Sequence, residues 1–203
     1  MAFLRIPYNT NDNIFRLFDF ARVYFEKCSI ITHENIEKNL KVILKPDKKY
    51  VGIAPGAGEK NKIWPIKNYI EICNYLQLKG FVLVFYLGPD EKQCQNILKN
   101  KFKTAIFLEE ESLLNKYRNI EIIMASTKFL KFAISNDSGV SHMLSTNHCP
   151  LIKLFGPKNS QKFTPKMDKL ISINSSEENS NNIEDIKISR VIDVIVSLEL
   201  KNV

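Results

Sequence analysis

The chain has 203 residues, 44% of them hydrophobic, and a formal net charge of +7. This length is enough for one α/β domain with an appendage, and it is short for two complete domains. The longest apolar run, residues 81–87, is far below the roughly 20 residues that cross a bilayer, and residues 1–12 lack the apolar core of a signal peptide. A cytoplasmic location is therefore expected, either free or peripheral to the inner membrane.

Neither the charge nor the cysteines indicate a special class of protein. Lysine greatly outnumbers arginine, the basic residues are dispersed and no nucleic-acid-binding motif is present, so we expect no specific nucleic-acid partner. The four cysteines are scattered, without a C-x-x-C pair or a His/Cys cluster at metal-ligand spacing. We therefore expect no disulfide framework, no metal and no other cofactor. The cysteines are Cys28, Cys73, Cys94 and Cys149.

The first 49 residues are predicted to be a helix and a connector. Apolar residues recur at helical spacing over 10–28, which predicts an amphipathic helix that must pack against another element. Residues 29–49 have the composition of a connector and end in a Pro- and Lys-rich stretch. The main domain is predicted to cover residues 50–203.

From Tyr50 onward, short apolar strands alternate with helices, and no internal repeat is visible. This alternation predicts a doubly wound, mostly parallel Rossmann-like sheet of the α/β class. In such sheets ligands bind beyond the carboxyl ends of the strands. The expected strands are 50–54, 81–87, 104–108, 132–136, 150–155 and 169–173. The expected helices run from Pro65 to Gly80, over 90–99, over 120–131, from about Gly139 and over 183–200, with a solvated loop at 174–182.

The loop after the first strand has the sequence GIAPGAG, from Gly52 to Gly58. Gly56 and Gly58 carry no side chains, so backbone N–H groups there can approach an anion closely. An ordinary strand-to-helix turn remains an alternative, and the loop has neither the G-x-G-x-x-G nor the Walker pattern. Lys62 follows, where an ammonium group can neutralise a phosphate. Trp64 is expected to pack rather than to bind a ligand.

The segment ISNDSGVSH, from Ile134 to His142, carries the strongest signal. An apolar strand ends at Asp137, and Ser138 and Gly139 open a short helix whose free N–H groups favour phosphate. Asp137 as a simple helix N-cap and His142 as a packed or capping residue remain alternatives. Gly156 ends the next strand at the same sheet edge. These loops together predict a crevice for an anionic ligand.

The order of these motifs resembles a known family. APGA, then K-x-W-P, a strand ending in GP with an acidic residue, SNDSG-x-x-H, and LFGP with a downstream Pro165 resemble the glycosyltransferase family that includes the ADP-heptose:lipopolysaccharide heptosyltransferases. The likeness spans about Tyr50 to Ile173. It implies that this chain is the donor-binding half of a two-domain GT-B enzyme. Such an enzyme transfers a sugar from a nucleotide-diphospho-sugar, here ADP-heptose, to lipopolysaccharide or a related glycan with inversion and without a metal.

The resemblance also assigns roles at the donor phosphates and sugar. It implies that Lys62 contacts the diphosphate and that Ser138, Gly139 and Val140 offer backbone amides to it. Asp137 would lie against the sugar and phosphate, with His142 supporting the loop.

For the nucleoside, the resemblance implies that Asp90, the acidic residue after Gly88, binds the ribose hydroxyls. The segment 111–120 would line the adenine. Gly56 and Gly156 belong to the loops that form the crevice.

Two departures from the family pattern affect function. Lys158 replaces the Thr usual after FGP, which affects a local phosphate or sugar contact. The family also carries an acceptor domain before the donor half, with the carboxylate that acts as general base, whereas residues 1–49 resemble only the tail of that domain. A base must lie within hydrogen-bond reach of the acceptor hydroxyl. Two hypotheses therefore stay open: a heptosyltransferase, or a non-catalytic binding module or split half that needs a partner chain carrying the acceptor domain.

Overall fold

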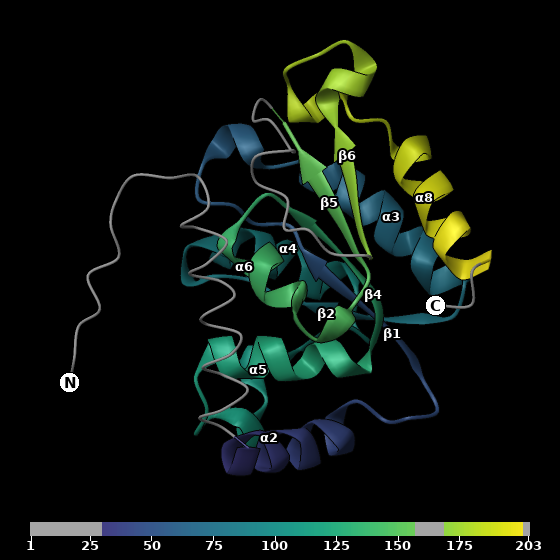
Figure 1. Ribbon diagram of the computed structural model, residues 1–203. Helices are drawn as coiled ribbons and strands as arrows, with labels where there is room; N and C mark the ends of the chain where they lie inside the picture. The colour runs from purple at the N-terminus through teal and green to yellow at the C-terminus, as the bar shows by residue number, and fades with distance from the viewer. Residues whose placement is uncertain (1–29, 157–168, 201–203) are drawn as a thin grey trace, which may run out of the picture.

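The computed structural model describes residues 30–156 and 169–200. Its centre is a six-stranded sheet with the strand order β3-β2-β1-β4-β5-β6, in which all neighbouring strands run parallel (Figure 1). The chain order reverses between β1 and β4, the topological switch point of a doubly wound sheet. The predicted Rossmann-like α/β fold is therefore confirmed, with an entirely parallel sheet.

The central strands are short and apolar on both faces, as parallel strands covered by helices must be. Five predicted strands lie within a few residues of their expected ends, whereas the strand expected at 104–108 is only two residues long. The strands are β1 (Lys49–Ala54), β2 (Phe81–Phe85), β3 (Ile106–Phe107), β4 (Leu130–Asn136), β5 (Leu151–Phe155) and β6 (Leu170–Asn174).

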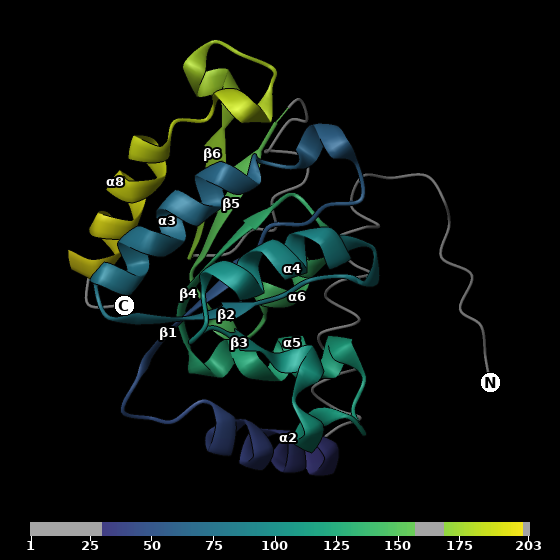
Figure 2. The same cartoon turned by 180° about the vertical axis from the view of Figure 1, so that it is seen from behind.

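Helices cover both faces of the sheet, as the two views of the ribbon show (Figures 1 and 2). Helices α3, α4 and α8 contribute to the apolar core on one face, and α2, α5 and α6 contribute to the core on the other. These helices are α2 (Ile30–Ile43), α3 (Ile66–Leu78), α4 (Lys92–Lys101), α5 (Asn119–Ser126), α6 (Gly139–Leu144) and α8 (Ile188–Leu200). The 3-10 turns that matter for the site are η1 (Lys60–Lys62), η2 (Pro89–Glu91) and η8 (Ile183–Asp185).

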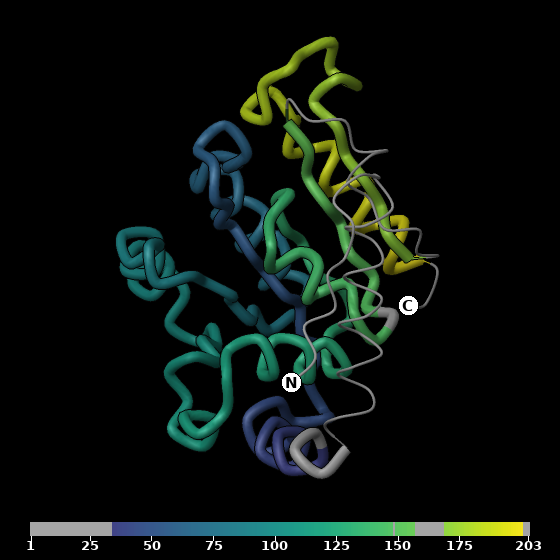
Figure 3. The backbone as a smooth tube through the Cα atoms, turned by 60° about the vertical axis from the view of Figure 1, so that its left-hand side comes forward, coloured from purple at the N-terminus to yellow at the C-terminus, as the bar shows by residue number. Residues whose placement is uncertain are grey.

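The prediction of a connector over 29–49 was largely wrong. Helix α2 occupies most of this segment, because Ile36 and Leu40 form a buried stripe along one helical face, which Leu44 continues just after the helix ends. The stripe packs in the same core cluster as Ile122 of α5, and the tube view shows α2 beside α5 (Figure 3). The predicted helix over 10–28 lies outside the described residues, and the boundary at residue 50 stays a prediction.

Two predicted helices differ at their ends. The helix expected over 120–131 stops at Ser126, because Leu130 already pairs with Tyr50 in the sheet. The closing helix begins at Ile188, and the residues before it form the turn η8, which buries Ile183. Within 30–156 and 169–200, no helix has the length and apolar character needed to span a membrane.

Candidate functional site

The site predicted from the sequence lies at the carboxyl edge of the sheet. The loops after β1 and β4 flank the switch point, where strand ends leave room for a ligand. The amide of Asp137 donates a hydrogen bond of 3.1 Å to the carbonyl of Leu154, which ties the end of β4 to β5. The carboxylate of Asp137 is thus fixed at the rim, next to the loop that carries Lys62.

Lys62 and Asp137 are brought together as the sequence predicted. The ammonium Nζ of Lys62 lies 3.8 Å from Oδ2 of Asp137 and 2.9 Å from Oε1 of Glu59. The Lys62 side chain is only 16% exposed, whereas that of Glu59 is 49% exposed. The nearer partner of Lys62 is therefore a half-exposed carboxylate. Water can solvate Glu59 if another anion takes its place beside Lys62.

A buried hydrogen-bond network holds the Lys62 loop in place. The side chain of Asn136, which is fully buried, donates from Nδ2 to the carbonyl of Pro55 at 2.6 Å. Its Oδ1 accepts from the amide of Trp64 at 3.3 Å and from the hydroxyl of Tyr69 at 2.9 Å. The network joins the ends of β1 and β4 to the start of α3. Asn136 therefore has a structural role that satisfies buried polar groups.

Trp64 packs, as expected from the sequence. Its ring is fully buried and meets the ring of Tyr69 edge to face at 5.2 Å between centroids. Its indole Nε1 donates to the carbonyl of Ile186 at 3.1 Å. The buried Trp64 thus fixes the position of the chain two residues after Lys62.

Lys153 is a site residue that the sequence reasoning missed. It lies in β5 with only 1% of its side chain exposed, and its Nζ is 2.7 Å from Oδ1 of Asp137. The same ammonium group lies over the ring of Phe155, 4.8 Å from the centroid. Burial lowers the pKa of Lys153, and the Asp137 carboxylate opposes that effect. The sequence does contain a signal for this residue. Lys153 lies inside the apolar strand LIKLF, and a buried charge must be paired.

His142 and Ser138 belong to the α6 side of the site. Burial, and then the charge of Lys153, lowers the pKa of His142 to about 4, although Asp137 acts in the opposite direction. The imidazole is therefore neutral at pH 7. Ser138 is the N-cap of α6, so the alternative that Asp137 serves as the N-cap is wrong. The Ser138 hydroxyl is buried and has no hydrogen-bond partner among the described residues.

The space beside Gly56 contains a carboxylate that the sequence reasoning did not select. A Cβ atom at Gly56 would lie 1.3 Å from Oε1 of Glu91, so a larger residue there would require the Glu91 side chain to move. Oε2 of Glu91 accepts a hydrogen bond of 2.6 Å from the amide of Gly88. Asp90 is exposed, and its proposed contact with ribose stays a prediction. Within the turn η2, it is therefore Glu91, and not the neighbouring Asp90, that places its carboxylate beside Gly56.

Gly156 permits close packing at the end of β5. A Cβ atom there would lie 3.0 Å from the carbonyl oxygen of Asn61 and 3.0 Å from Cβ of Ile183. The glycine thus lets η1 and η8 converge on the strand. Gly139, the first residue of α6, is exposed, and a Cβ atom at Gly139 or at Gly58 would meet nothing within 4 Å. Val140 is half-buried.

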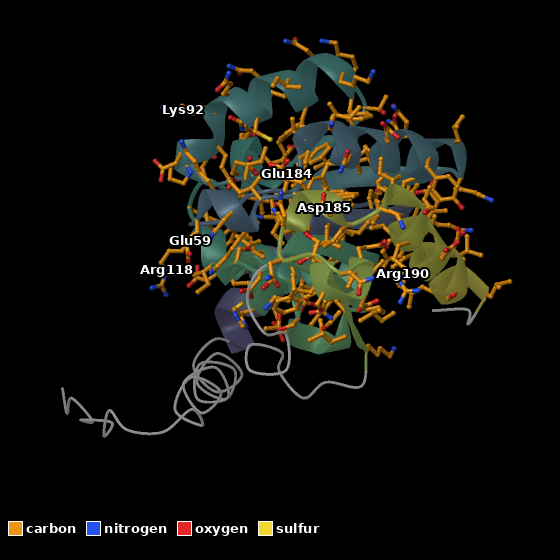
Figure 4. The ribbon with its side chains drawn as sticks, turned by 90° about the horizontal axis from the view of Figure 1, so that it is seen from above. Glu59, Lys92, Arg118, Glu184, Asp185 and Arg190 are labelled. Atoms are coloured by element: carbon orange, nitrogen blue, oxygen red, sulfur yellow. The ribbon has the colours of Figure 1, made fainter. Side chains whose placement is uncertain are left out.

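The surface on this side of the molecule carries charges of both signs. The exposed residues labelled in the view from above are the acidic Glu59, Glu184 and Asp185 and the basic Lys92, Arg118 and Arg190 (Figure 4).

A small pocket that is open to solvent lies beside β2 and α5. Apolar side chains dominate its wall, and burial raises the pKa of the one carboxyl group there, that of Glu109. Of the segment predicted to line adenine, 111–120, only Asn119 contributes to this pocket. The lining residues are Tyr86, Leu87, Leu108, Glu109, Asn119, Ile122 and Ile123.

No cluster of three or more His, Cys, Asp or Glu side chains suited to a metal ion occurs in the described part of the chain. The charged chemistry of the site consists of lysine ammonium and carboxylate groups.

Comparisons with known proteins agree with this fold. Lipopolysaccharide heptosyltransferase 1 of Campylobacter coli is 22% identical over 187 residues, which cover 90% of this chain and 55% of that protein. The crystal structure of a family 9 glycosyl transferase from Veillonella parvula DSM 2008 superposes with a TM-score of 0.69 at 19% identity, covering 83% of this chain and 51% of the other. The E. coli heptosyltransferase WaaC, solved with ADP, gives a TM-score of 0.62 at 18% identity over 76% of this chain and 45% of the other.

This chain thus spans about half the length of the proteins that it matches. The structural likenesses show a shared fold. The sequence matches the family model of glycosyltransferase family 9 (heptosyltransferase) over residues 18–190, which is most of the chain. With these motifs on one edge of a doubly wound sheet, the chain belongs to glycosyltransferase family 9.

Proposed function

We propose that this chain binds a nucleotide-diphospho-sugar, ADP-heptose, as the donor for heptosyl transfer to lipopolysaccharide core or a related glycan. The observation that carries the proposal is the pairing of Lys62 with Asp137 beside the Ser138-Gly139 turn, at the switch point of the sheet. Family membership supports a sugar-transfer role, and a relative in the same fold was solved with ADP.

The diphosphate is proposed to lie against Lys62. Cleavage of the sugar–phosphate bond leaves negative charge on the departing nucleotide, and a fixed ammonium group stabilises that charge. A phosphate would displace the solvated carboxylate of Glu59 from Lys62. The unpartnered hydroxyl of Ser138 supports a ligand beside the same turn, because a buried polar group ordinarily has a hydrogen-bond partner.

The nucleoside is proposed to extend toward β2. The small open pocket beside Tyr86 and Ile122 presents apolar side chains against which one face of a purine base can pack. Glu91 lies between this pocket's strand and Gly56, where a carboxylate can accept hydrogen bonds from ribose hydroxyls. Asp90 and Glu91 are therefore both candidates for the ribose contact.

The donor-site proposal is tested by ligand-induced stabilisation. ADP-heptose, or ADP itself, should raise the thermal midpoint of the purified chain, because a ligand that binds only the folded state stabilises it. Lys62→Ala should abolish that shift. Lys128→Ala is the matched control, since Lys128 pairs with Glu37 just before β4 begins, away from the strands' carboxyl ends. Absence of binding at millimolar ADP or any other nucleoside diphosphate would refute the donor site.

The second candidate function is a non-catalytic binding module or a split half that acts with a partner chain. The observation that favours it is the engagement of the site's carboxylates by N–H and ammonium groups. A general base for the acceptor hydroxyl needs an oxygen within hydrogen-bond reach of that hydroxyl. Both functions include donor binding. They differ in whether the chain alone can transfer the sugar to an acceptor.

A further inference from the structure

We propose that Lys153 is a positioning residue of the donor site, whose buried ammonium group neutralises Asp137 and thereby leaves Lys62 to the donor diphosphate. The inference rests on the proposed function, because it assigns a task within the same site. It concerns a residue in β5 that directly precedes the LFGP motif and lies one strand away from the loop that carries SNDSG-x-x-H.

The first argument is the division of partners at Asp137. One carboxylate oxygen is 2.7 Å from Nζ of Lys153, and the other is 3.8 Å from Nζ of Lys62. The shorter, more buried pair is therefore the one with Lys153, which is 1% exposed. Lys62, at 16% exposed, has its shorter contact with Glu59. Lys153 is thus the fixed partner of Asp137, and Lys62 is the exchangeable one.

The second argument concerns the charge that a diphosphate would meet. Asp137 lies beside the turn where the phosphates are proposed to bind, and an uncompensated carboxylate there would repel them. If Lys153 were absent, Lys62 would have to compensate Asp137 as well as the ligand. With Lys153 in place, the Lys153–Asp137 pair is neutral, and the charge of Lys62 attracts the ligand.

The third argument is that stability alone does not account for a lysine at this position. The rest of β5 is apolar and buried, and an apolar side chain of similar volume often stabilises a core as well as an ion pair does, or better. Lys153 is held in place by Asp137 and by the ring of Phe155 at 4.8 Å. The free energy needed to bury a charged lysine here is therefore better explained by a role in the site than by stability alone.

The test is a double-mutant cycle with ADP binding as the readout, measured by calorimetry on the whole chain. The variants are Lys153→Met, Asp137→Asn and the double variant, with Lys128→Met as a control that removes one lysine charge before the start of β4. Lys153→Met should weaken ADP binding about tenfold or more. In the Asp137→Asn background the same change should alter the affinity by about twofold or less, because no charge is left to neutralise.

Lys153→Gln covers the case in which Lys153→Met fails to fold, because glutamine keeps a hydrogen-bond donor for Asp137 without the charge. It should weaken ADP binding to a similar extent while circular dichroism shows an intact fold. ADP affinity within twofold of the parent in both Lys153 variants would overturn the inference and leave the donor site standing. Equal losses in both backgrounds would also overturn it, since Lys153 would then attract the ligand directly. A parent chain that binds no ADP would instead refute the proposed function.

Discussion

Individual residues at the carboxyl edge combine charge and burial in a way that sets their protonation. Asp137 faces two ammonium groups, and His142 lies close enough to the buried Lys153 to be affected by its charge. Because burial and Lys153 both disfavour a charged imidazole, His142 is a neutral side chain at pH 7. This neutrality has a measurable consequence for stability in acid.

The pH dependence of stability should contain a contribution from His142. Its pKa falls from an ordinary 6.5 to about 4 in the folded chain, so between these values the unfolded state binds a proton that the folded state does not. The free energy of unfolding should therefore fall as the pH is lowered from 6.5 to 4, and this contribution should be absent above pH 6.5. His142→Gln should flatten the dependence in urea titrations at pH 6.5 and 4.5. Parallel pH profiles for parent and variant would contradict a depressed pKa.

Residue-level prediction from the sequence succeeded where a motif and a strand end coincide. The approach of Lys62 to Asp137 was predicted, since both follow parallel strands that end at one edge. Lys153 was missed because periodicity marks β5 only as apolar and does not show which charge an interior lysine meets. The inward position of Glu91 rather than Asp90 depends on the geometry of one 3-10 turn, which the sequence pattern does not specify.

At the scale of elements, the strands and helices with a clear hydrophobic period were predictable from the sequence. Helices with a weak period were not, because the elements that they pack against could not be predicted. The alternation after Tyr50 predicted the six strands and the helices between them. Helix α2 was missed because its apolar stripe is sparse among polar residues, and its stability depends on packing against α5 and Leu114. Tertiary contacts therefore decided its structure, as they commonly do for helices of low intrinsic stability.

The joint between β1, β4 and α3 should depend on Asn136 more than on Tyr69. Asn136→Ala removes three hydrogen bonds and leaves buried groups of Pro55, Trp64 and Tyr69 without partners, which should cost about 3 kcal/mol or more of unfolding free energy. Tyr69→Phe removes one of these bonds and should cost about 1 kcal/mol. Urea denaturation of the two variants measures the difference. An equal or larger loss for Tyr69→Phe would show that the network is not centred on Asn136.

At the scale of the whole molecule, the groups proposed to bind the donor lie along one edge of a single parallel sheet. The chain aligns with between about a third and a half of the length of its relatives, and the proposed donor groups lie on its own sheet edge. The formal charge of +7 does not by itself indicate nucleic acid, because the lysines and arginines are dispersed along the sequence. The sequence therefore predicted the fold and the family, whereas the ligand and the reaction stay predictions.

The chain as given should bind the donor without transferring sugar. Asp137 and Glu59 face lysine ammonium groups and Glu91 accepts from the Gly88 amide, so none of these three is placed as a base for an acceptor hydroxyl. ADP release from ADP-heptose, measured with a lipopolysaccharide core acceptor, should stay at background for this chain. A fusion that places the amino-terminal half of the Campylobacter coli relative before it should restore transfer, with ADP affinity serving as the folding control in both proteins. Robust transfer by the unfused chain would eliminate the split-half hypothesis, since the general base would then have to lie within these 203 residues.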